Sequence, residues 1–178
     1  MLRRLAAGVT LVAALALAGC TPPEPTESTT PVATPSPTTT TGVAIDAFAA
    51  AEQFNELVDQ SFATNQVPSA ELAALATPEV VDRIELEVST FAEQSLRTEG
   101  TSVLEGREAV EATGDDALAL LTCLDTSGVT TFGPDGPVQP GGVPRQPWLF
   151  EFNVSDGAPI ITYAGPPPEP RSIPGCGS

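Results

Sequence analysis

Two kinds of side chain in this sequence could do chemistry: three cysteines and a large excess of carboxylates. The cysteines are Cys20, Cys123 and Cys176, and the 178-residue chain has 23 Asp and Glu residues against 7 Arg, with no Lys and no His. A thiol can be acylated or oxidised, and a buried carboxylate can act as a general acid or base. The absence of histidine excludes Ser-His-Asp and Cys-His catalysis. Any catalysis would depend on carboxylates, Tyr163 or arginine.

Cys20 ends a segment that is typical of a lipid attachment site. Two arginines precede an apolar run of 13 residues (5–17), and Ala18-Gly19 stands directly before Cys20. This pattern resembles the lipobox of bacterial lipoprotein signal peptides. The resemblance implies cleavage before Cys20, a diacylglycerol on its sulfur, and a protein held on the extracytoplasmic face of the cell membrane. The run is shorter than the roughly 20 apolar residues of a membrane-spanning helix, although an ordinary secretory signal remains an alternative.

The other two cysteines can form one pair. With Cys20 assigned to lipid, Cys123 can bond only to Cys176, and a compartment outside the cytoplasm favours a disulfide. Closing a loop of about 54 residues would stabilise the fold by roughly 4 kcal/mol in the chain-entropy model. A redox-active pair is the alternative, but the C-x-x-C spacing is absent and Cys176 lies in a Pro/Gly-rich tail. A structural disulfide is therefore predicted.

The charge of the chain limits its partners. The formal net charge is −16, and cleavage before Cys20 would remove two of the seven arginines and no acid, giving −18. Such a chain is repelled by nucleic acids and by anionic lipid surfaces, so we expect no nucleic-acid partner and membrane contact through the lipid alone. The acids are scattered, Asp115-Asp116 is the only adjacent pair, and no calcium-loop spacing occurs. Cation binding is the alternative explanation of the acidity, but the scattered acids favour solubility, and no metal or cofactor is predicted.

The chain divides into three parts. Residues 1–19 are the expected signal peptide, 20–43 the lipidated cysteine with a Pro/Thr-rich linker, and 44–178 a folded domain with a Pro-rich C-terminal tail. The linker has almost nothing that could pack, so we expect it to be disordered and extended. At about 3.1 Å per residue it would reach roughly 70 Å.

The first half of the domain has helical periodicity. The spacing of apolar residues predicts helices over 45–63, capped by Asp46, over 69–76, and from Thr77 to a point before Gly100. Their apolar stripes are expected to be core faces rather than ligand sites. In the first helix, Asp59 belongs to the opposite, polar face.

After Gly100 the periodicity changes to that of strands. Strands are predicted over 101–112, 117–124, 148–154 and 160–163, with turns at 113–116 and 155–157. Residues 129–132 either extend the second strand or begin an excursion, and 140–144 cannot be regular structure. Helices followed by antiparallel strands indicate an α+β fold.

The order and lengths of these elements resemble the NTF2-like/SnoaL-like superfamily. More narrowly, the chain is similar to small secreted lipoproteins of high-GC Gram-positive bacteria, through the Cys-x-Asp strand at 118–127, the paired strand at 148–154 and the Gly-Cys end at 175–176. The resemblance implies N-terminal helices packed on a curved antiparallel sheet that forms a cone, with the Cys-x-Asp strand tied to the C-terminal cysteine. The chain departs from the pattern after the last turn, where tryptophan is replaced by Ala158-Pro159, and in a longer loop over 132–147.

Two functions fit these features. The first is a membrane-anchored cell-envelope lipoprotein acting as a non-catalytic binding or interaction module, with a cell-envelope protein as partner. The alternative is a small-molecule carrier or a carboxylate-based enzyme that uses the cavity of the cone, with an unidentified ligand. In that case Asp125 or Glu151 would serve as the base if buried.

Each of these candidate residues also has a structural explanation. Asp125 would cap the turn that follows it. Trp148 and Tyr163 could form a binding platform, but the alternation of Trp148, Phe150 and Phe152 favours packing on a sheet face. No catalytic residue is assigned.

Overall fold

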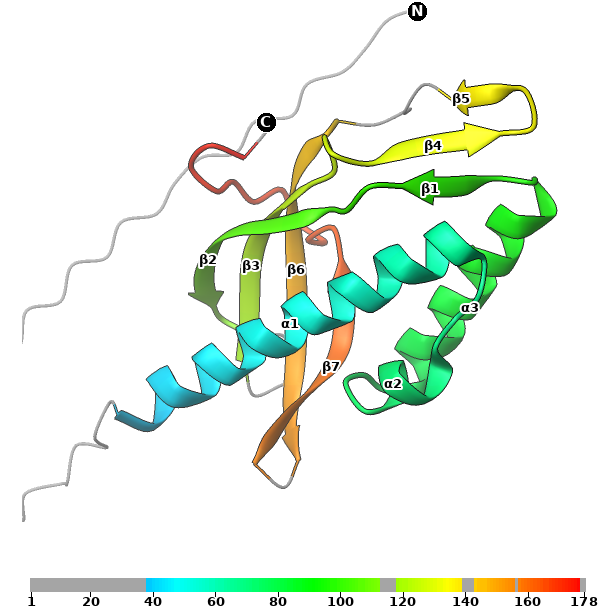
Figure 1. Cartoon of the computed structure of the whole chain (residues 1–178). Coiled ribbons are helices and arrows are strands. Elements are labelled where there is room, and N and C mark those ends of the chain that lie inside the picture. Colours follow the sequence, from blue (N-terminus) through cyan, green and yellow to red (C-terminus); the bar gives the residue numbers. More distant parts are fainter. Residues whose placement is uncertain (1–37, 113–117, 139–142, 156, 177–178) are drawn as a thin grey trace, which may run out of the picture. The chain divides into compact units, whose positions relative to one another are not determined.

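The computed structural model describes residues 38–112, 118–138, 143–155 and 157–176, with three helices followed by seven strands in this part of the chain (Figure 1). The helices are α1 (Thr38–Thr64), α2 (Ser69–Ala73) and α3 (Pro78–Glu93). The strands are β1 (Arg97–Glu99), β2 (Val103–Val110), β3 (Leu118–Asp125), β4 (Thr130–Gly133), β5 (Gly136–Val138), β6 (Arg145–Ser155) and β7 (Ala158–Gly165).

The strands form two antiparallel sheets that run into each other through a bend. One sheet has the order β2-β3-β6-β7 and the other the order β1-β4-β5. The chain passes through the bend twice, from β1 into β2 and from β3 into β4 (Figure 1). The same two segments pair on both sides of it, as β1 with β4 and as β2 with β3. Gly100, in the bend, has φ +95°, and a Cβ there would lie 2.0 Å from the carbonyl oxygen of Gly128. Only glycine allows this close approach of the two bent segments.

The helices pack on one face of the four-stranded sheet. Phe54 of α1 and Ile84 of α3 share a core with Phe150, Phe152 and other buried residues of the sheet. Side chains alternate along a strand, so the neighbours of Phe150 and Phe152 on β6 point to the other face. The predicted α+β class, with N-terminal helices packed on a curved antiparallel sheet, is confirmed.

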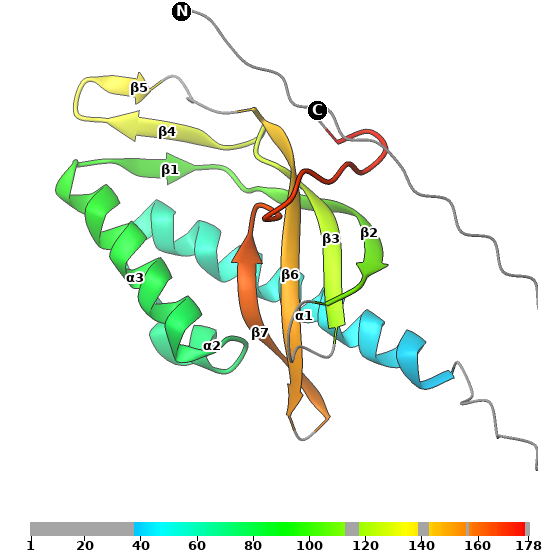
Figure 2. The same ribbon diagram turned by 180° about the vertical axis from the view of Figure 1, so that it is seen from behind.

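The C-terminal segment covers the opposite face of the same sheet. Figure 2 shows it crossing β6 on the side away from the helices. Ile173 packs there with Leu121 and Leu149, and the sulfurs of Cys123 and Cys176 are 2.05 Å apart. The structure thus places Cys123 and Cys176, the two cysteines that the sequence analysis did not assign to lipid, at disulfide distance. With both faces covered, the first seven residues of β3 are all buried, as is usual for a strand between two layers.

The free edge of β7 is protected by the connection between α2 and α3. The N–H of Ile161 donates to the carbonyl of Leu75 (2.8 Å), and the N–H of Thr77 donates to the carbonyl of Ile161 (2.9 Å). This short parallel bridge between Ala76 and Ile161 occupies backbone groups that would otherwise offer an edge for pairing with another chain.

Several boundaries differ from the sequence-based prediction. Helix α1 begins at Thr38, inside the segment assigned to the linker, so Asp46 lies within the helix and does not cap it. Thr77 is the N-cap residue of α3, but its hydroxyl makes no capping hydrogen bond. The strands β1 and β5 were not predicted, and residues 129–132 begin an excursion in which β4 pairs with both of them.

Some predictions lie outside the described residues. These are the signal peptide, Cys20, the linker up to residue 37, the turn at 113–116, and most of 140–144. Among the residues that are described, no helix has both the length and the apolar character required to cross a bilayer.

Candidate functional site

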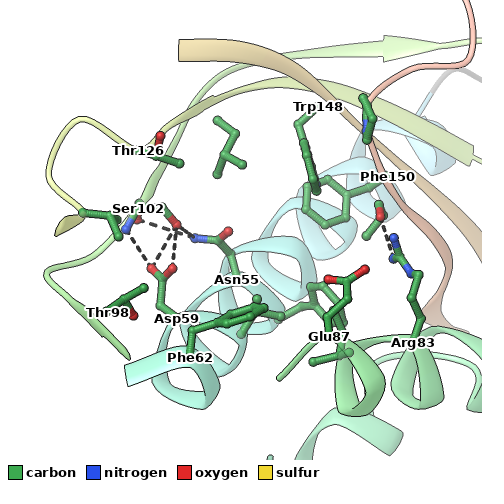
Figure 3. A pocket seen from close by; sticks show the side chains of 17 residues that line it. Asn55, Asp59, Phe62, Arg83, Glu87, Thr98, Ser102, Thr126, Trp148 and Phe150 are labelled. Atoms are coloured by element: carbon green, nitrogen blue, oxygen red, sulfur yellow. Dashed lines mark hydrogen bonds between the residues drawn. The ribbon is translucent and has the colours of Figure 1, made fainter. Parts of the chain in front are cut away.

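A cavity of about 360 Å³ lies between the helices and the sheet (Figure 3). It is bounded by α1, α3 and β6, and by the bends that connect the two sheets. Most of its lining is apolar. The lining residues are Phe54, Asn55, Val58, Asp59, Phe62, Arg83, Ile84, Glu87, Thr98, Ser102, Leu124, Thr126, Val129, Trp148, Phe150, Ala164 and Pro166.

Aromatic rings form much of the cavity wall. Phe54, Phe62, Trp148 and Phe150 line it, and the whole chain has only seven Phe, one Trp and one Tyr. Phe54 meets Phe150 edge to face with ring centroids 6.2 Å apart, and Phe62 meets Phe91 in the same way at 5.2 Å. These contacts hold the rings in place, because edge-to-face packing fixes their orientation as well as their position. The wall is therefore formed before any ligand binds.

A polar cluster around Asp59 forms one end of the cavity. The backbone N–H of Ser102 donates to Asp59 Oδ2 (2.7 Å), and the Ser102 hydroxyl donates to the same carboxylate at 2.9–3.0 Å. The Asn55 amide donates to the Ser102 hydroxyl (2.9 Å). Because Asn55 and Asp59 come from α1 and Ser102 from the bend between β1 and β2, this chain of hydrogen bonds also joins helix to sheet (Figure 3).

Burial raises the pKa of Asp59 above its ordinary value. The hydrogen bonds from Ser102 act in the opposite direction, and the negative charge of Glu56 adds to the rise. A carboxyl group with a raised pKa holds its proton more readily near neutral pH, which is a property of general acids and bases.

We predict that Asp59 makes folding less favourable as the pH rises. The Asp59 carboxyl binds a proton more tightly in the folded protein than in the unfolded chain. Its contribution to the free energy of unfolding is therefore greatest below about pH 3.8, falls as the pH rises through the folded pKa, and is constant above that pKa. The difference in unfolding free energy between wild type and Asp59→Asn should therefore decrease across that range in denaturant titrations at several pH values.

Glu56→Gln provides the matched test of this prediction. It removes the neighbouring charge, so the decrease should move to lower pH. A difference between wild type and Asp59→Asn that rises with pH would contradict the assigned direction.

Two side chains of α3 place opposite charges at the other end of the cavity. Arg83 donates from one guanidinium nitrogen to the carbonyl oxygen of Ala164 (2.6 Å). Figure 3 shows Glu87 turned toward the cavity between Phe62 and Arg83. Although Arg83 and Glu87 are four residues apart, they form no ion pair with each other in the described structure. Both charges are therefore available to a ligand.

Neither of the carboxylates proposed as bases lies in this cavity. Asp125 accepts a hydrogen bond from the N–H of Ser127 (2.8 Å) and forms an ion pair with Arg145 (3.0 Å). Hydrogen bonds from Ser127 lower the pKa of Asp125, and Arg145 lowers it further. Asp125 therefore caps its turn, as the structural explanation held.

Glu151 is buried but faces away from the helices. On β6 it alternates with Phe150 and Phe152, which point to the helix side, and in register it lies opposite Ala119 and Tyr163. The alternation of side chains along a strand therefore excludes Glu151 from the cavity.

The two residues considered for a binding platform are also separated. Trp148 packs on the helix side and lines the cavity, whereas Tyr163 belongs to the cluster under the C-terminal segment. The Tyr163 hydroxyl donates to the carbonyl of Pro166 (2.6 Å). A shared platform is therefore wrong, but Trp148 does reach the candidate site.

Nothing in the sequence around Asp59 indicates that it is part of a site. It lies on the polar face of an amphipathic helix, where a carboxylate is normally solvated. Only its contact with Ser102, 43 residues later in the chain, makes it half-buried. Among the described residues, no group of three or more His, Cys, Asp and Glu could hold a metal ion.

Comparison with known proteins gives likenesses in structure only. No protein-family model and no curated protein matches the sequence. The intermembrane space region of the chloroplast protein ARC6 is similar with a TM-score of 0.48 and 9% identity, over 68% of this chain and 94% of that one. The transfer protein TraH from the Gram-positive conjugative plasmid pIP501 gives 0.45 and 11%, over 68% and 91%. A protein named as a polyketide cyclase from Xanthomonas campestris gives 0.32 and 13%, over 67% and 89%. Function must therefore be inferred from the site's own residues.

Proposed function

We propose that this protein is a lipid-anchored extracytoplasmic protein whose domain binds a small, mainly apolar molecule. The cavity is the observation that supports this proposal. Its volume of about 360 Å³ falls within the range of roughly 300–1,000 Å³ that is usual for small-molecule sites. Such sites combine an apolar wall with a few fixed polar groups, and here Arg83 and Glu87 would orient the ligand.

In this proposal Cys20 carries the lipid and determines where the domain works. Two acyl chains hold a protein stably on a bilayer, whereas one gives marginal binding. The Pro/Thr-rich segment after Cys20 would then let the domain move within reach of the membrane. A binding protein held in this way can collect or deliver a molecule at the cell surface.

Binding without catalysis agrees best with the state of Asp59. Both of its oxygens accept hydrogen bonds from Ser102, so the carboxylate is occupied in joining α1 to the sheet. The second candidate, a carboxylate-based enzyme, is favoured by the raised pKa of Asp59. The Asp59→Asn variant distinguishes the two, since it should retain ligand binding and would abolish a reaction that needs this base.

An interaction with another protein finds less support on the described surface. Its large exposed apolar side chains are Leu86 on α3, Val103 on β2, Val138 on β5 and Val143 in the loop before β6. Contiguous apolar patches are what usually mark a protein-binding surface. A cell-envelope protein partner would therefore have to bind through polar groups.

Native mass spectrometry of protein purified from its own cell membranes tests the binding proposal. We expect a defined additional mass on wild type beyond the anchor, and its loss in Val58→Phe, which extends a ring from α1 into the cavity. Gln60→Phe places the same ring on the exposed side of that helix and should keep the ligand. The intact mass also tests the anchor, because the mature chain should begin at a diacylglycerol-modified Cys20.

An additional mass that Val58→Phe retains would place the ligand elsewhere. Wild-type protein without any additional mass, together with failure to bind apolar probes, would overturn the proposal.

A further inference from the structure

The charges around the cavity are unequal. Asp59 and Glu87 place two carboxyl groups on its lining, against the single guanidinium of Arg83. That guanidinium already donates to the carbonyl oxygen of Ala164. In addition, the chain as a whole carries a formal charge of −16. A cleft in a strongly acidic protein concentrates cations and repels anions.

The aromatic wall has a surface that suits a cation. Trp148 and Phe62 line the cavity and are half-buried, while Phe54 and Phe150, which also line it, are buried. The face of an aromatic ring carries negative electrostatic potential and attracts ammonium groups, most strongly in tryptophan. The structure already contains two such contacts, with Arg97 and Arg107 each 4.9 Å from a phenylalanine ring centroid.

Glu87 lines the same cavity as the rings of Trp148 and Phe150. In the view of Figure 3 the Glu87 side chain extends from α3 toward the cavity, and Glu87 is exposed. A positive group held there would contact both a negative charge and ring faces. The apolar remainder of the ligand would occupy the space between Val58, Phe62 and Leu124.

We propose that the ligand of this cavity is an organic cation, an amine or quaternary ammonium compound with an apolar body. This inference rests on the proposed binding function and adds the chemical class of the ligand. Glu87 supplies the counter-charge and Trp148 the ring face. The opposite assignment, an organic acid bound by Arg83, would place the ligand's negative charge at the end of the cavity where Glu87 also lies.

Trp148 makes the test direct, because it is the only tryptophan of the chain and lines the cavity. The full-length protein is titrated with benzyltrimethylammonium, with its neutral carbon isostere neopentylbenzene, and with the anion 3-phenylpropionate. We expect the cation to produce a saturable change in Trp148 fluorescence at concentrations about tenfold lower than the other two probes require. The difference would come from a charge contact combined with a cation–π contact.

Two variants of α3 assign the charge effect to a residue. Glu87→Gln should weaken binding of the cation about fivefold and leave the neutral probe unchanged, as expected for a partly exposed ion pair. Asp82→Asn removes the same charge from an exposed position on α3 outside the cavity and should leave both unchanged. Circular dichroism verifies that each variant is folded.

The alternative outcomes separate this inference from the proposed function. Tighter binding of 3-phenylpropionate, lost in Arg83→Gln, would overturn the organic cation and leave a small-molecule site for an acid. Equal binding of the charged and neutral probes would also overturn it, because charge would then have no role. If no probe changes Trp148 fluorescence, the inference and the proposed function both fail.

Discussion

Replacing Cys123 and Cys176 together by alanine should lower the free energy of unfolding by about 4 kcal/mol, because the unfolded chain would lose a cross-link that closes a long loop. The two residues are 53 positions apart and join β3 to the C-terminal segment. Denaturant unfolding followed by Trp148 fluorescence measures the loss. Dithiothreitol should lower the stability of wild type by a similar amount.

The matched control for this prediction is Cys20→Ser. It removes the third cysteine of the chain, which takes no part in the disulfide, so the sensitivity of the domain to dithiothreitol should remain as in wild type. A double alanine variant as stable as wild type would show that the loop is already restrained in the unfolded state.

Phe152→Ala should destabilise the domain by about 4 kcal/mol, within the range of 3–5 kcal/mol that is usual for truncating a buried phenylalanine. Phe152 is fully buried in the centre of the four-stranded sheet, opposite Leu118 on one side and Ile161 on the other. Its ring also stacks on Phe150, with centroids 6.3 Å apart. The variant removes these contacts and leaves a cavity that the two flanking strands cannot close. Urea titration gives the change in unfolding free energy.

Asn153→Ala is the control on the same strand. Asn153 is exposed, so its truncation should change the stability by less than about 0.5 kcal/mol. A similar loss in both variants would mean that β6 tolerates no substitution, and a loss below about 1 kcal/mol in Phe152→Ala would mean that the core can rearrange to fill the space.

The elements with strong local patterns could be predicted from the sequence. The stripe of Val81, Ile84 and Val88 predicts α3, and the alternation of Trp148, Phe150 and Phe152 predicts β6. In contrast, β1 and β5 have three residues each, and β5 contains a proline. Strand β1 pairs with β4 from far away in the sequence, and β5 pairs with β4 in a tight hairpin. Three residues are too few to show the alternation that identifies a strand.

The candidate site was harder to predict because it depends on contacts across the fold. The disulfide could be predicted from the number of cysteines and from the expected location outside the cytoplasm, with no knowledge of where the two residues lie in the fold. Asp59 and Ser102 meet only because the bend at Gly100 turns the sheet toward α1. Glu151 was a candidate base because it is a carboxylate in an apolar strand. It alternates with Phe150 and Phe152 along β6, so its side chain lies on the face of the sheet opposite the cavity.

The covering of the outer sheet face by the C-terminal segment has a consequence for how the protein matures. If the chain is exported from its N-terminus, as proposed, Cys123 would leave the cytoplasm before Cys176, which follows 53 residues later. Until then Leu121 and Leu149 lack the cover that Ile173 gives them. In the proposed extracytoplasmic setting the disulfide would form only after Cys176 has been exported, which would make oxidation a late step of maturation.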